Sequence, residues 1–560
     1  MPFETDRIQF IHSLFSTSFC EIVTAGVLRG EKSRFQLFGD TVNTAARMES
    51  NGARERIHIS QETADLIEAA NKPHWLTPRE DKIHAKGKGE LQTYWLEIKR
   101  DNNMSGNMSM EDESESDYSD FTEEDSLEED VDGEIVLDER SQRLVDWTVD
   151  QLSRLLKQIA ARRQLLGLVV DPEIAEKQVL DFSDGGTVID EVEDVVELLP
   201  FDPKATNLDA LVDNITLSAE VVSQLRDFVA TIATLHNDNQ FHNLSHATHV
   251  TMSVVKLLSR IVAVDDPRLV YAEGSDESEM SQEATDQRLH DFSYGLRSDP
   301  LAQFGVVFSA LIHDVDHPGV TNAELIKENA KVAQTYNGKC ISEQNSVDLA
   351  WYLLMDERYS DLRGAIYHDE TDLRRFRQLV VNAVIATDIA DKELKVQRDQ
   401  KWENAFREGP TETPQQILNR KATVMIDCLL QSSDIAHTMQ HWHIYRKWNE
   451  FLFRELYVAY LAGRCEKNPA DFWYDGEIGF FDFYIIPLAK KLADCGVFGV
   501  SSDEYLNYAR KNRNEWKARG KGIVEEYIEN AKDLHAPESG EEEEDSTLTE
   551  HFQDEDGVDA

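Results

Sequence analysis

The sequence predicts a mainly α protein with a small α/β fragment at its amino-terminal end. Apolar residues recur every three or four positions through most of the region from about 205 to 535, which is the helical period. RIHIS (56–60) and TYWLEI (93–98) instead alternate apolar and polar residues, as half-buried strands do. Two strongly acidic runs mark the borders between these regions.

The composition excludes several classes of partner. The formal net charge of the 560 residues is −49, which argues against a nucleic-acid polymer, because phosphate-backbone binding needs a basic surface. No uncharged apolar run reaches the ~18 residues that a membrane span requires. The five cysteines lie far apart without a CxxC pair, which fits a reducing compartment and predicts a cytoplasmic location.

The acidic runs divide the chain into parts. Of the 24 residues from Glu111 to Glu134, 14 are Asp or Glu and none is Lys or Arg, so this run is predicted to be a disordered linker. Residues 538–560 hold another 11 acidic residues. The predicted parts are an α/β fragment (1–100), an acidic linker (101–138), a connecting helix and linker (139–200), a helical domain (201–537) and an acidic disordered tail (538–560).

An apolar seam follows the acidic linker. Val145, Val149, Leu152, Leu156 and Ile159 follow the spacing of one helix face. Two interpretations stay open at this stage. The seam is either a short coiled coil in a homodimer or the inner face of a helix that packs on its own domain.

The helical region carries side chains typical of metal sites. FHNLSH (241–246) places His242 and His246 four residues apart, which predicts one helix face. HDVDH (313–317) follows the apolar run QFGVVFSALI, and VIATDI (384–389) and LLQSSDIAH (429–437) each place an aspartate after apolar positions. Buried charges need partners or a cation, and imidazole with carboxylate suits zinc beside a harder ion.

These segments, taken in order, resemble class I 3′,5′-cyclic-nucleotide phosphodiesterases. The resemblance rests on FHNLSHATHV, ALIHDVDHPGV, SEQN, VIATDI, SSDIAH, IYRKW and IGFFDFYIIPL, and it covers nearly all of 205–500. It implies an all-helical phosphodiesterase domain of the HD type that uses one Zn²⁺ and one Mg²⁺ (or Mn²⁺). In such a site two cations neutralise the phosphate and activate water.

The resemblance also implies roles for individual residues. The implied zinc ligands are His246, His313, Asp314 and Asp434, of which Asp314 would bridge to the second ion. His242 matches the general acid that protonates the leaving 3′ oxygen. The implied surrounding shell, which holds water and orients ligands, consists of His317, Glu343, Thr387 and Asp388.

One departure from the family bears on nucleotide preference. Glu477 stands where the family has a glutamine that hydrogen-bonds the purine, and Phe480 matches the ring that stacks on it. A carboxylate only accepts hydrogen bonds, so it could take both guanine N1–H and N2–H. This predicts a preference for cGMP over cAMP; the alternative is that Glu477 points elsewhere or is protonated.

The amino-terminal part resembles the second half of a class III, guanylate-type nucleotidyl cyclase. FGDTVNTAARMES and HAKGKGELQTYWL carry the resemblance, which covers about 25–97 and implies a partial ferredoxin-like fold. Asn43 and Arg47 match the pair that stabilises the transition state, and Lys86 matches a triphosphate-binding lysine. The family's metal-binding aspartates have no counterpart here, so the fragment is expected to be inactive alone. It is then a remnant or the end of a longer receptor, although it could contribute Asn43 and Arg47 to a cyclase partner that supplies the metals.

The sequence therefore predicts a two-metal hydrolase that converts a 3′,5′-cyclic nucleotide into the 5′-monophosphate. Two alternatives stay open: a non-catalytic nucleotide-binding or scaffold protein, and an HD-type phosphohydrolase of another phosphate ester. The cyclase resemblance also admits the cytosolic end of a longer membrane receptor.

Overall fold

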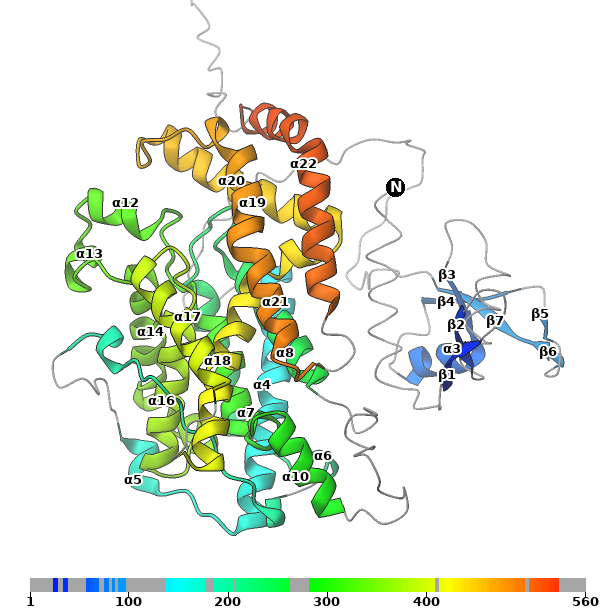
Figure 1. Cartoon of the computed structure of the whole chain (residues 1–560). Coiled ribbons are helices and arrows are strands. Elements are labelled where there is room, and N and C mark those ends of the chain that lie inside the picture. The colour runs from blue at the N-terminus through cyan, green and yellow to red at the C-terminus, as the bar shows by residue number, and fades with distance from the viewer. Residues whose placement is uncertain are drawn as a thin grey trace, which may run out of the picture. The chain divides into compact units, whose positions relative to one another are not determined.

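The computed structural model divides the chain into two compact units, Met1–Glu124 and Asp125–Ala560, which are taken one at a time below (Figure 1). The structure describes residues 24–28, 34–38, 57–69, 75–79, 83–85, 89–96, 137–177, 186–205, 208–261, 282–407, 412–498 and 503–532. The predicted disordered linker (all but its last two residues) and the predicted acidic tail lie outside the described residues.

The described residues of the first unit form three small antiparallel sheets and one helix. β3 (Ile57–Ser60) and β4 (Leu76–Pro78) flank β7 (Thr93–Leu96), so that Leu96 faces Ile57 on one side and Leu76 on the other. α3 (Gln61–Ala69) follows β3 directly and packs on this sheet through a small core of Ile59, Ala64, Ile67 and Leu96. The remaining strands form two hairpins, β1 (Thr24–Leu28) with β2 (Arg34–Phe38) and β5 (Ile83–Ala85) with β6 (Gly89–Leu91).

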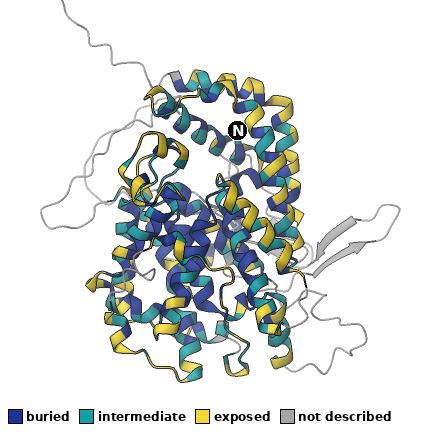
Figure 2. Cartoon of the chain, turned by 60° about the vertical axis from the view of Figure 1, so that its left-hand side comes forward, coloured by how far each residue is buried: buried dark blue, intermediate teal, exposed yellow. Residues whose placement is uncertain are grey.

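The second unit is helical throughout its described residues, as the sequence predicts. Its helices are α4 (Glu139–Leu166), α5 (Pro172–Glu176), α6 (Leu208–Val212), α7 (Ala219–Thr234), α8 (Leu244–Arg260), α10 (Gln282–Phe292), α11 (Pro300–Ile312), α12 (Asn322–Lys327), α13 (Lys331–Thr335), α14 (Ile341–Leu354), α15 (Ser360–Ile366), α16 (Glu370–Ile385), α17 (Lys392–Ala405), α18 (Pro414–Asp434), α19 (Trp442–Leu461), α20 (Trp473–Phe480), α21 (Ile486–Asp494) and α22 (Asp503–Lys532). Buried residues are concentrated where these helices face one another (Figure 2).

Helix α11 lies at the centre of this unit. Its sequence, PLAQFGVVFSALI, is apolar except at Gln303 and Ser309, and every residue of the helix but Gln303 is buried. A helix of this kind needs apolar neighbours all round, and α4, α8 and α16 supply them. Asp299 caps its amino end by accepting a hydrogen bond from the backbone N–H of Ala302, and His313 follows its last residue. The central helix thus ends directly before HDVDH.

Helix α4 settles the two interpretations of the apolar seam. All five seam residues, from Val145 to Ile159, are buried in the same core as α7 and α11. The seam therefore packs on its own unit. The region 139–200, which the sequence analysis separates from the catalytic domain, contributes to this core through α4.

One turn of π-helix joins α20 to α21. Residues Phe481–Ile485 form this turn, with Phe481 and Ile485 completely buried. A π-turn adds one residue to the helical repeat and is frequent at functional sites. Among the described helices, none is both long enough and apolar enough to cross a membrane.

Candidate active site

Four predicted ligands come from three helix ends that meet in the core. His246 lies in the first turn of α8, His313 and Asp314 follow the end of α11, and Asp434 is the last residue of α18. Packing of α8 against both α11 and α18 brings these ends together. Both histidines are buried, whereas the aspartate side chains retain 14% and 19% exposure, which leaves the cluster open on its carboxylate side.

The side-chain atoms of this cluster converge on one point. His246 Nε2 lies 3.1 Å from Asp434 Oδ1 and 3.4 Å from Asp314 Oδ2. His313 Nε2 lies 3.1 Å from Asp314 Oδ2 and 3.5 Å from Asp434 Oδ1. His246, His313 and Asp434 thus bring one ligand atom each within 4.8 Å of one another, and Asp314 Oδ2 lies within 3.4 Å of both imidazole nitrogens.

The hydrogen bonding of the cluster fits a divalent cation. His313 Nδ1 donates to the carbonyl oxygen of Ala310 at 3.0 Å, which directs the lone pair of Nε2 toward the cluster. His313 Nε2 and Asp314 Oδ2 are both buried, and neither has a hydrogen-bond partner of acceptable geometry. Buried polar atoms are normally satisfied, so a cation bound by this N₂O₂ set explains both orphans.

The charges of the cluster fit a cation through its carboxylates. Burial opposes ionisation, yet the neighbouring carboxylates raise the pKa of His313 well above its ordinary value, so a bound cation would have to displace a proton from that ring. Burial likewise raises the pKa of the Asp314 and Asp434 carboxyls, but the neighbouring imidazoles outweigh it and lower both. The carboxylates are therefore ionised at neutral pH, as metal ligands must be.

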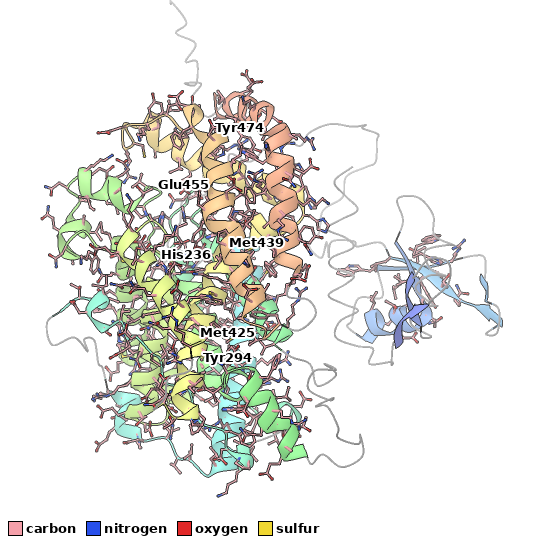
Figure 3. All side chains as sticks on the ribbon, in the orientation of Figure 1. His236, Tyr294, Met425, Met439, Glu455 and Tyr474 are labelled. Atoms are coloured by element: carbon pink, nitrogen blue, oxygen red, sulfur yellow. The ribbon has the colours of Figure 1, made fainter. Side chains whose placement is uncertain are left out.

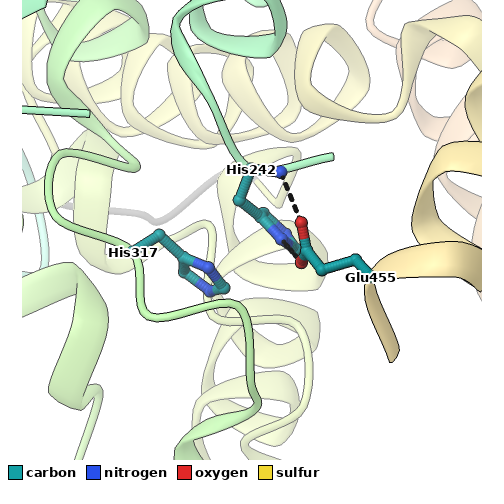
Figure 4. A group of neighbouring side chains, drawn as sticks. All are labelled: His242, His317 and Glu455. Carbon is teal, nitrogen blue, oxygen red and sulfur yellow. Dashed lines mark hydrogen bonds and ion pairs between the residues drawn. The ribbon is translucent and has the colours of Figure 1, made fainter. Parts of the chain in front are cut away.

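His242 belongs to a second, adjacent group with Glu455 and His317 (Figure 4). Its Nδ1 lies 2.5 Å from Glu455 Oε1, and the rings of His242 and His317 lie 3.8 Å apart between centroids. Glu455 Oε2 also accepts hydrogen bonds from the backbone N–H groups of Phe241 and His242, at 2.8 and 2.9 Å. Glu455, from α19, thus fixes both the ring and the backbone of His242.

The prediction that His242 and His246 share one helix face is wrong. Helix α8 begins at Leu244, because the side chain of Asn243 caps it by accepting a hydrogen bond from the backbone N–H of His246 at 3.1 Å. His242 therefore lies before the helix, in a segment free to turn its ring toward Glu455. The two histidines still come together, with ring centroids 5.9 Å apart.

The Glu455 pair keeps His242 charged. Burial lowers the pKa of His242, but the carboxylate of Glu455 outweighs it and raises that pKa to about 9. Reciprocally, burial raises the pKa of Glu455, and His242 lowers it to about 2. Burial and then the charge of His242 lower the pKa of His317 to about 3, so His317 is neutral beside an imidazolium. One of the two stacked rings is therefore a proton donor at neutral pH.

A third group joins Glu343 and Asp388 through Asn322. Asn322 Nδ2 donates to Glu343 Oε2 at 2.9 Å and to Asp388 Oδ2 at 3.3 Å. Burial, followed by the charge of Asp388, raises the pKa of Glu343 to about 8. Thr387, next to Asp388, donates its hydroxyl to the carbonyl oxygen of Val384 at 2.7 Å.

Glu477 and Phe480 lie on α20. The buried carboxyl of Glu477 accepts a hydrogen bond from the Tyr445 hydroxyl at 2.7 Å. Burial raises the pKa of Glu477 and this hydrogen bond lowers it, with a result of about 7. Phe480 stacks on Tyr484, with ring centroids 5.3 Å apart and planes 8° from parallel. Burial and then the charge of Asp434 raise the pKa of Tyr484, so this aromatic pair lies within the field of the metal-type cluster.

The structure adds residues that the sequence analysis missed. Glu455, Asn322 and Tyr445 hold His242, the Glu343–Asp388 pair and Glu477 respectively. Glu455 lies in FLFRELYV, where Arg454 and Glu455 interrupt an apolar run, and this is the only signal the sequence offers for it. The cyclase-type residues Asn43, Arg47 and Lys86 lie outside the described residues.

Comparison with known protein families identifies two regions. Residues 241–497 match the family described as 3′5′-cyclic nucleotide phosphodiesterase, and residues 20–98 match the adenylate and guanylate cyclase catalytic domain.

Curated relatives match about half of this chain. A human dual specificity calcium/calmodulin-dependent 3′,5′-cyclic nucleotide phosphodiesterase 1C is 26% identical over 265 residues, which is 46% of this chain and 31% of the relative. A probable 3′,5′-cyclic-AMP phosphodiesterase pde-4 of Caenorhabditis elegans is 23% identical over 295 residues, or 51% of this chain and 38% of the relative. The chain thus spans about a third of the length of these relatives.

A solved structure, the phosphodiesterase domain of the RhoPDE fusion protein of the choanoflagellate Salpingoeca rosetta, is 20% identical. The match covers 60% of this chain and 97% of that one, with a TM-score of 0.40.

Proposed function

Because residues 241–497 form a domain of the 3′5′-cyclic nucleotide phosphodiesterase family, we propose that the chain hydrolyses a 3′,5′-cyclic nucleotide to the 5′-monophosphate. One observation carries the proposal: an N₂O₂ cluster with unsatisfied buried atoms lies beside an imidazolium held by a buried carboxylate. Such a pairing suits cleavage of a phosphodiester, which needs charge neutralisation on one side and a proton for the leaving oxygen on the other.

We assign the first cation to His246, His313, Asp314 and Asp434, with zinc as the metal that suits this donor set. A second cation, Mg²⁺ or Mn²⁺, would share Asp314, with Glu343, Thr387, Asp388 and His317 as the surrounding residues. Divalent cations in such a site stabilise phosphate charge and activate water at neutral pH.

His242 is the proposed general acid. Since Nδ1 faces Glu455, the proton available for transfer is on Nε2, which would protonate the departing 3′ oxygen. Glu455 stabilises the charged form before the transfer. His317, neutral and stacked on the same ring, adds no competing positive charge.

Nucleotide preference is assigned to Glu477 and Phe480. Tyr445 donates to Glu477 Oε2, which leaves the rest of the carboxylate to accept hydrogen bonds. An acceptor-only group favours guanine, which offers two neighbouring N–H donors, so we propose cGMP as the better substrate. The four described cysteines are free thiols, which supports a reducing compartment such as the cytosol.

The test is steady-state hydrolysis of cAMP, cGMP and a linear phosphodiester by the purified chain, with metal content measured on the same preparation. We expect turnover of cyclic nucleotides that a chelator abolishes and that His313→Ala removes. An exposed substitution, His443→Ala, is the control and should leave the rate unchanged.

The alternatives give different results in this assay. A nucleotide-binding or scaffold protein would bind cyclic nucleotide without releasing the monophosphate. A phosphohydrolase of another ester would hydrolyse the linear diester at least as fast as either cyclic nucleotide. Chelator-resistant turnover, or full activity of His313→Ala, would contradict the proposed site.

A further inference from the structure

The middle of helix α22 carries an excess of positive charge. Between residues 507 and 522 it holds six Lys or Arg residues and one acidic residue, Glu515, whereas the whole chain has a net charge of −49. The helix lies along the outer edge of the helical unit, beside α19 and α20 (Figure 1). Surface charge of one sign on a protein of the opposite sign indicates a place where an anionic group can bind.

Four of these cations are exposed. Arg510, Lys517 and Lys521 follow one another at i, i+7 and i+11, so they share one helix face, and Lys511 follows Arg510 about 100° further round the helix. All four are exposed, while Ala509, Trp516 and other residues of the opposite face are buried in the core. These four residues are called the basic stripe below.

The basic stripe differs from its neighbours in how its charges are compensated. Arg513 makes a two-point ion pair with Asp482, at 2.9 and 2.7 Å, and Arg519 lies 3.8 Å from Glu515. None of the four cations of the stripe has a carboxylate within 4.0 Å among the residues that the structure describes. The Lys521 ammonium instead lies 5.2 Å from the ring centre of Tyr474. Figure 3 places Tyr474 at the end of the unit where α20 meets α22.

A segment of the same chain has the complementary charge. Residues 538–560 contain 11 Asp or Glu residues and no Lys or Arg, and they begin six residues after the last residue of α22. Arg510 lies 22 residues before that end, about 33 Å along the helix at 1.5 Å per residue. An extended chain covers about 3.3 Å per residue, so 23 residues reach back over the whole stripe.

We propose that residues 538–560 fold back along α22 and bind the basic stripe of the same molecule through ion pairs. The short connection keeps their local concentration high, so each ion pair can be weak. The second acidic run, 111–134, has similar charge but is separated from α22 by most of the chain. The contact does not depend on the proposed catalytic function.

The contact would place the acidic segment one helix away from the nucleotide-recognition residues. Tyr474 of α20 donates its hydroxyl to the carbonyl oxygen of Lys517 at 3.0 Å, and Trp516 Nε1 donates to the carbonyl oxygen of Tyr474 at 3.1 Å. These bonds hold α22 against the helix that carries Glu477. In the proposed contact, residues 538–560 cover the outer side of α22, whereas the inner side of α22 supports α20.

Zero-length carbodiimide crosslinking of the full chain tests the proposal, because it joins only carboxylates and amines in direct contact. Peptide mass spectrometry should find residues 538–560 linked to Lys511, Lys517 or Lys521. Raising salt from ~0.01 M to ~1 M shortens the Debye length from about 30 to about 3 Å, so the yield should fall by roughly fivefold or more. Mixing ¹⁴N- and ¹⁵N-labelled protein should show links within one molecule.

Two matched variants make the outcome decisive. K511E/K517E/K521E should remove these crosslinks, whereas K331E/K392E/K395E, which changes three exposed lysines elsewhere, should leave them intact. Links from 538–560 spread evenly over exposed lysines, links mainly between molecules, or links to the stripe mainly from 111–134 would each overturn the proposal. So would a yield that is insensitive to salt.

Discussion

Two buried glutamates of the helical unit are ionised very differently, although each has one principal side-chain partner. Glu455 faces His242, and its pKa falls to about 2; Glu477 faces Tyr445, and its pKa rises to about 7. Burial raises the pKa of both carboxyls, so the difference between them comes from the partner of each. An imidazole can accept a proton and carry positive charge, whereas a phenol only donates a hydrogen bond. α19 supplies one member of each pair, Glu455 and Tyr445.

The comparison shows how one scaffold can supply two kinds of carboxyl. The His242–Glu455 pair is a fixed charge pair whose imidazolium can donate a proton. In the Tyr445–Glu477 pair, the carboxyl of Glu477 changes its protonation state within the physiological pH range. The first pair suits catalysis and the second suits recognition of a base. Each prediction below tests one side of this contrast.

Removing the proton donor should have the largest effect. We expect His242→Asn to lower kcat for cyclic nucleotides by about 10²–10⁴-fold, the usual contribution of a general acid. The p-nitrophenolate group of a p-nitrophenyl diester departs without needing a proton, so hydrolysis of that diester should fall far less. Steady-state kinetics on both substrates measures the difference. An equal loss on both would show that His242 acts only by holding the site together; His441→Asn, an exposed histidine, is the control.

Neutralising Glu455 should shift a pH profile as well as a rate. In Glu455→Gln the charge that holds the pKa of His242 at about 9 is gone, so that pKa should fall below neutrality under the effect of burial. The acid form is populated below its pKa, so activity at pH 8 should drop by about tenfold or more and recover partly at pH 6. If kcat of Glu455→Gln falls at the same alkaline pH as in the unaltered chain, the activity does not depend on this pair.

Glu477 should make nucleotide preference depend on pH. With a pKa of about 7, the carboxyl is mostly protonated at pH 6, where it both donates and accepts, and mostly ionised at pH 8, where it only accepts. The cGMP/cAMP ratio of kcat/KM should therefore rise with pH, by up to about tenfold, or about 1.4 kcal/mol. Taking the ratio cancels titrations common to both substrates. Glu477→Gln should flatten the profile, and a flat profile in the unaltered chain would refute the assignment.

Tyr445→Phe should have the smallest effect. Loss of the hydroxyl removes the hydrogen bond that lowers the pKa of Glu477, so that pKa should rise and the cGMP preference at pH 7.5 should fall by a few-fold. The lost bond should also reduce the free energy of unfolding by about 1–2 kcal/mol, which denaturant titration measures. A drop in stability without any change in preference would mean that Tyr445 has only a structural role.

The sequence predicts the catalytic pair incompletely, for a physical reason. His242 is visible because HNLSH is a short local pattern. Glu455 lies more than two hundred residues away among other charged residues of α19, and its burial follows from the packing of that helix. Long-range partners of this kind have no local periodicity that would reveal them.

The fold shows the same division between local and long-range signals. The helical period predicts α11 and the core position of its residues, and the seam of α4 predicts a helix but not what it packs on. The start of α8 depends on Asn243 as its cap, so the spacing of His242 and His246 alone gives the wrong local geometry. The converging cluster itself follows well from the motifs, because each lies at a helix end.

The π-turn at Phe481–Ile485 has a consequence for how much length variation this part of the chain can accept. Losing one residue there would restore ordinary pitch and rotate the preceding helix by about 100° against the one that follows. Glu477 would then swing off Tyr445 while α21 stayed in place. A surface loop can accept the loss or gain of one residue. At this π-turn the same change would displace Glu477, the residue to which we assign base preference, so this segment can vary by substitution more readily than by insertion or deletion.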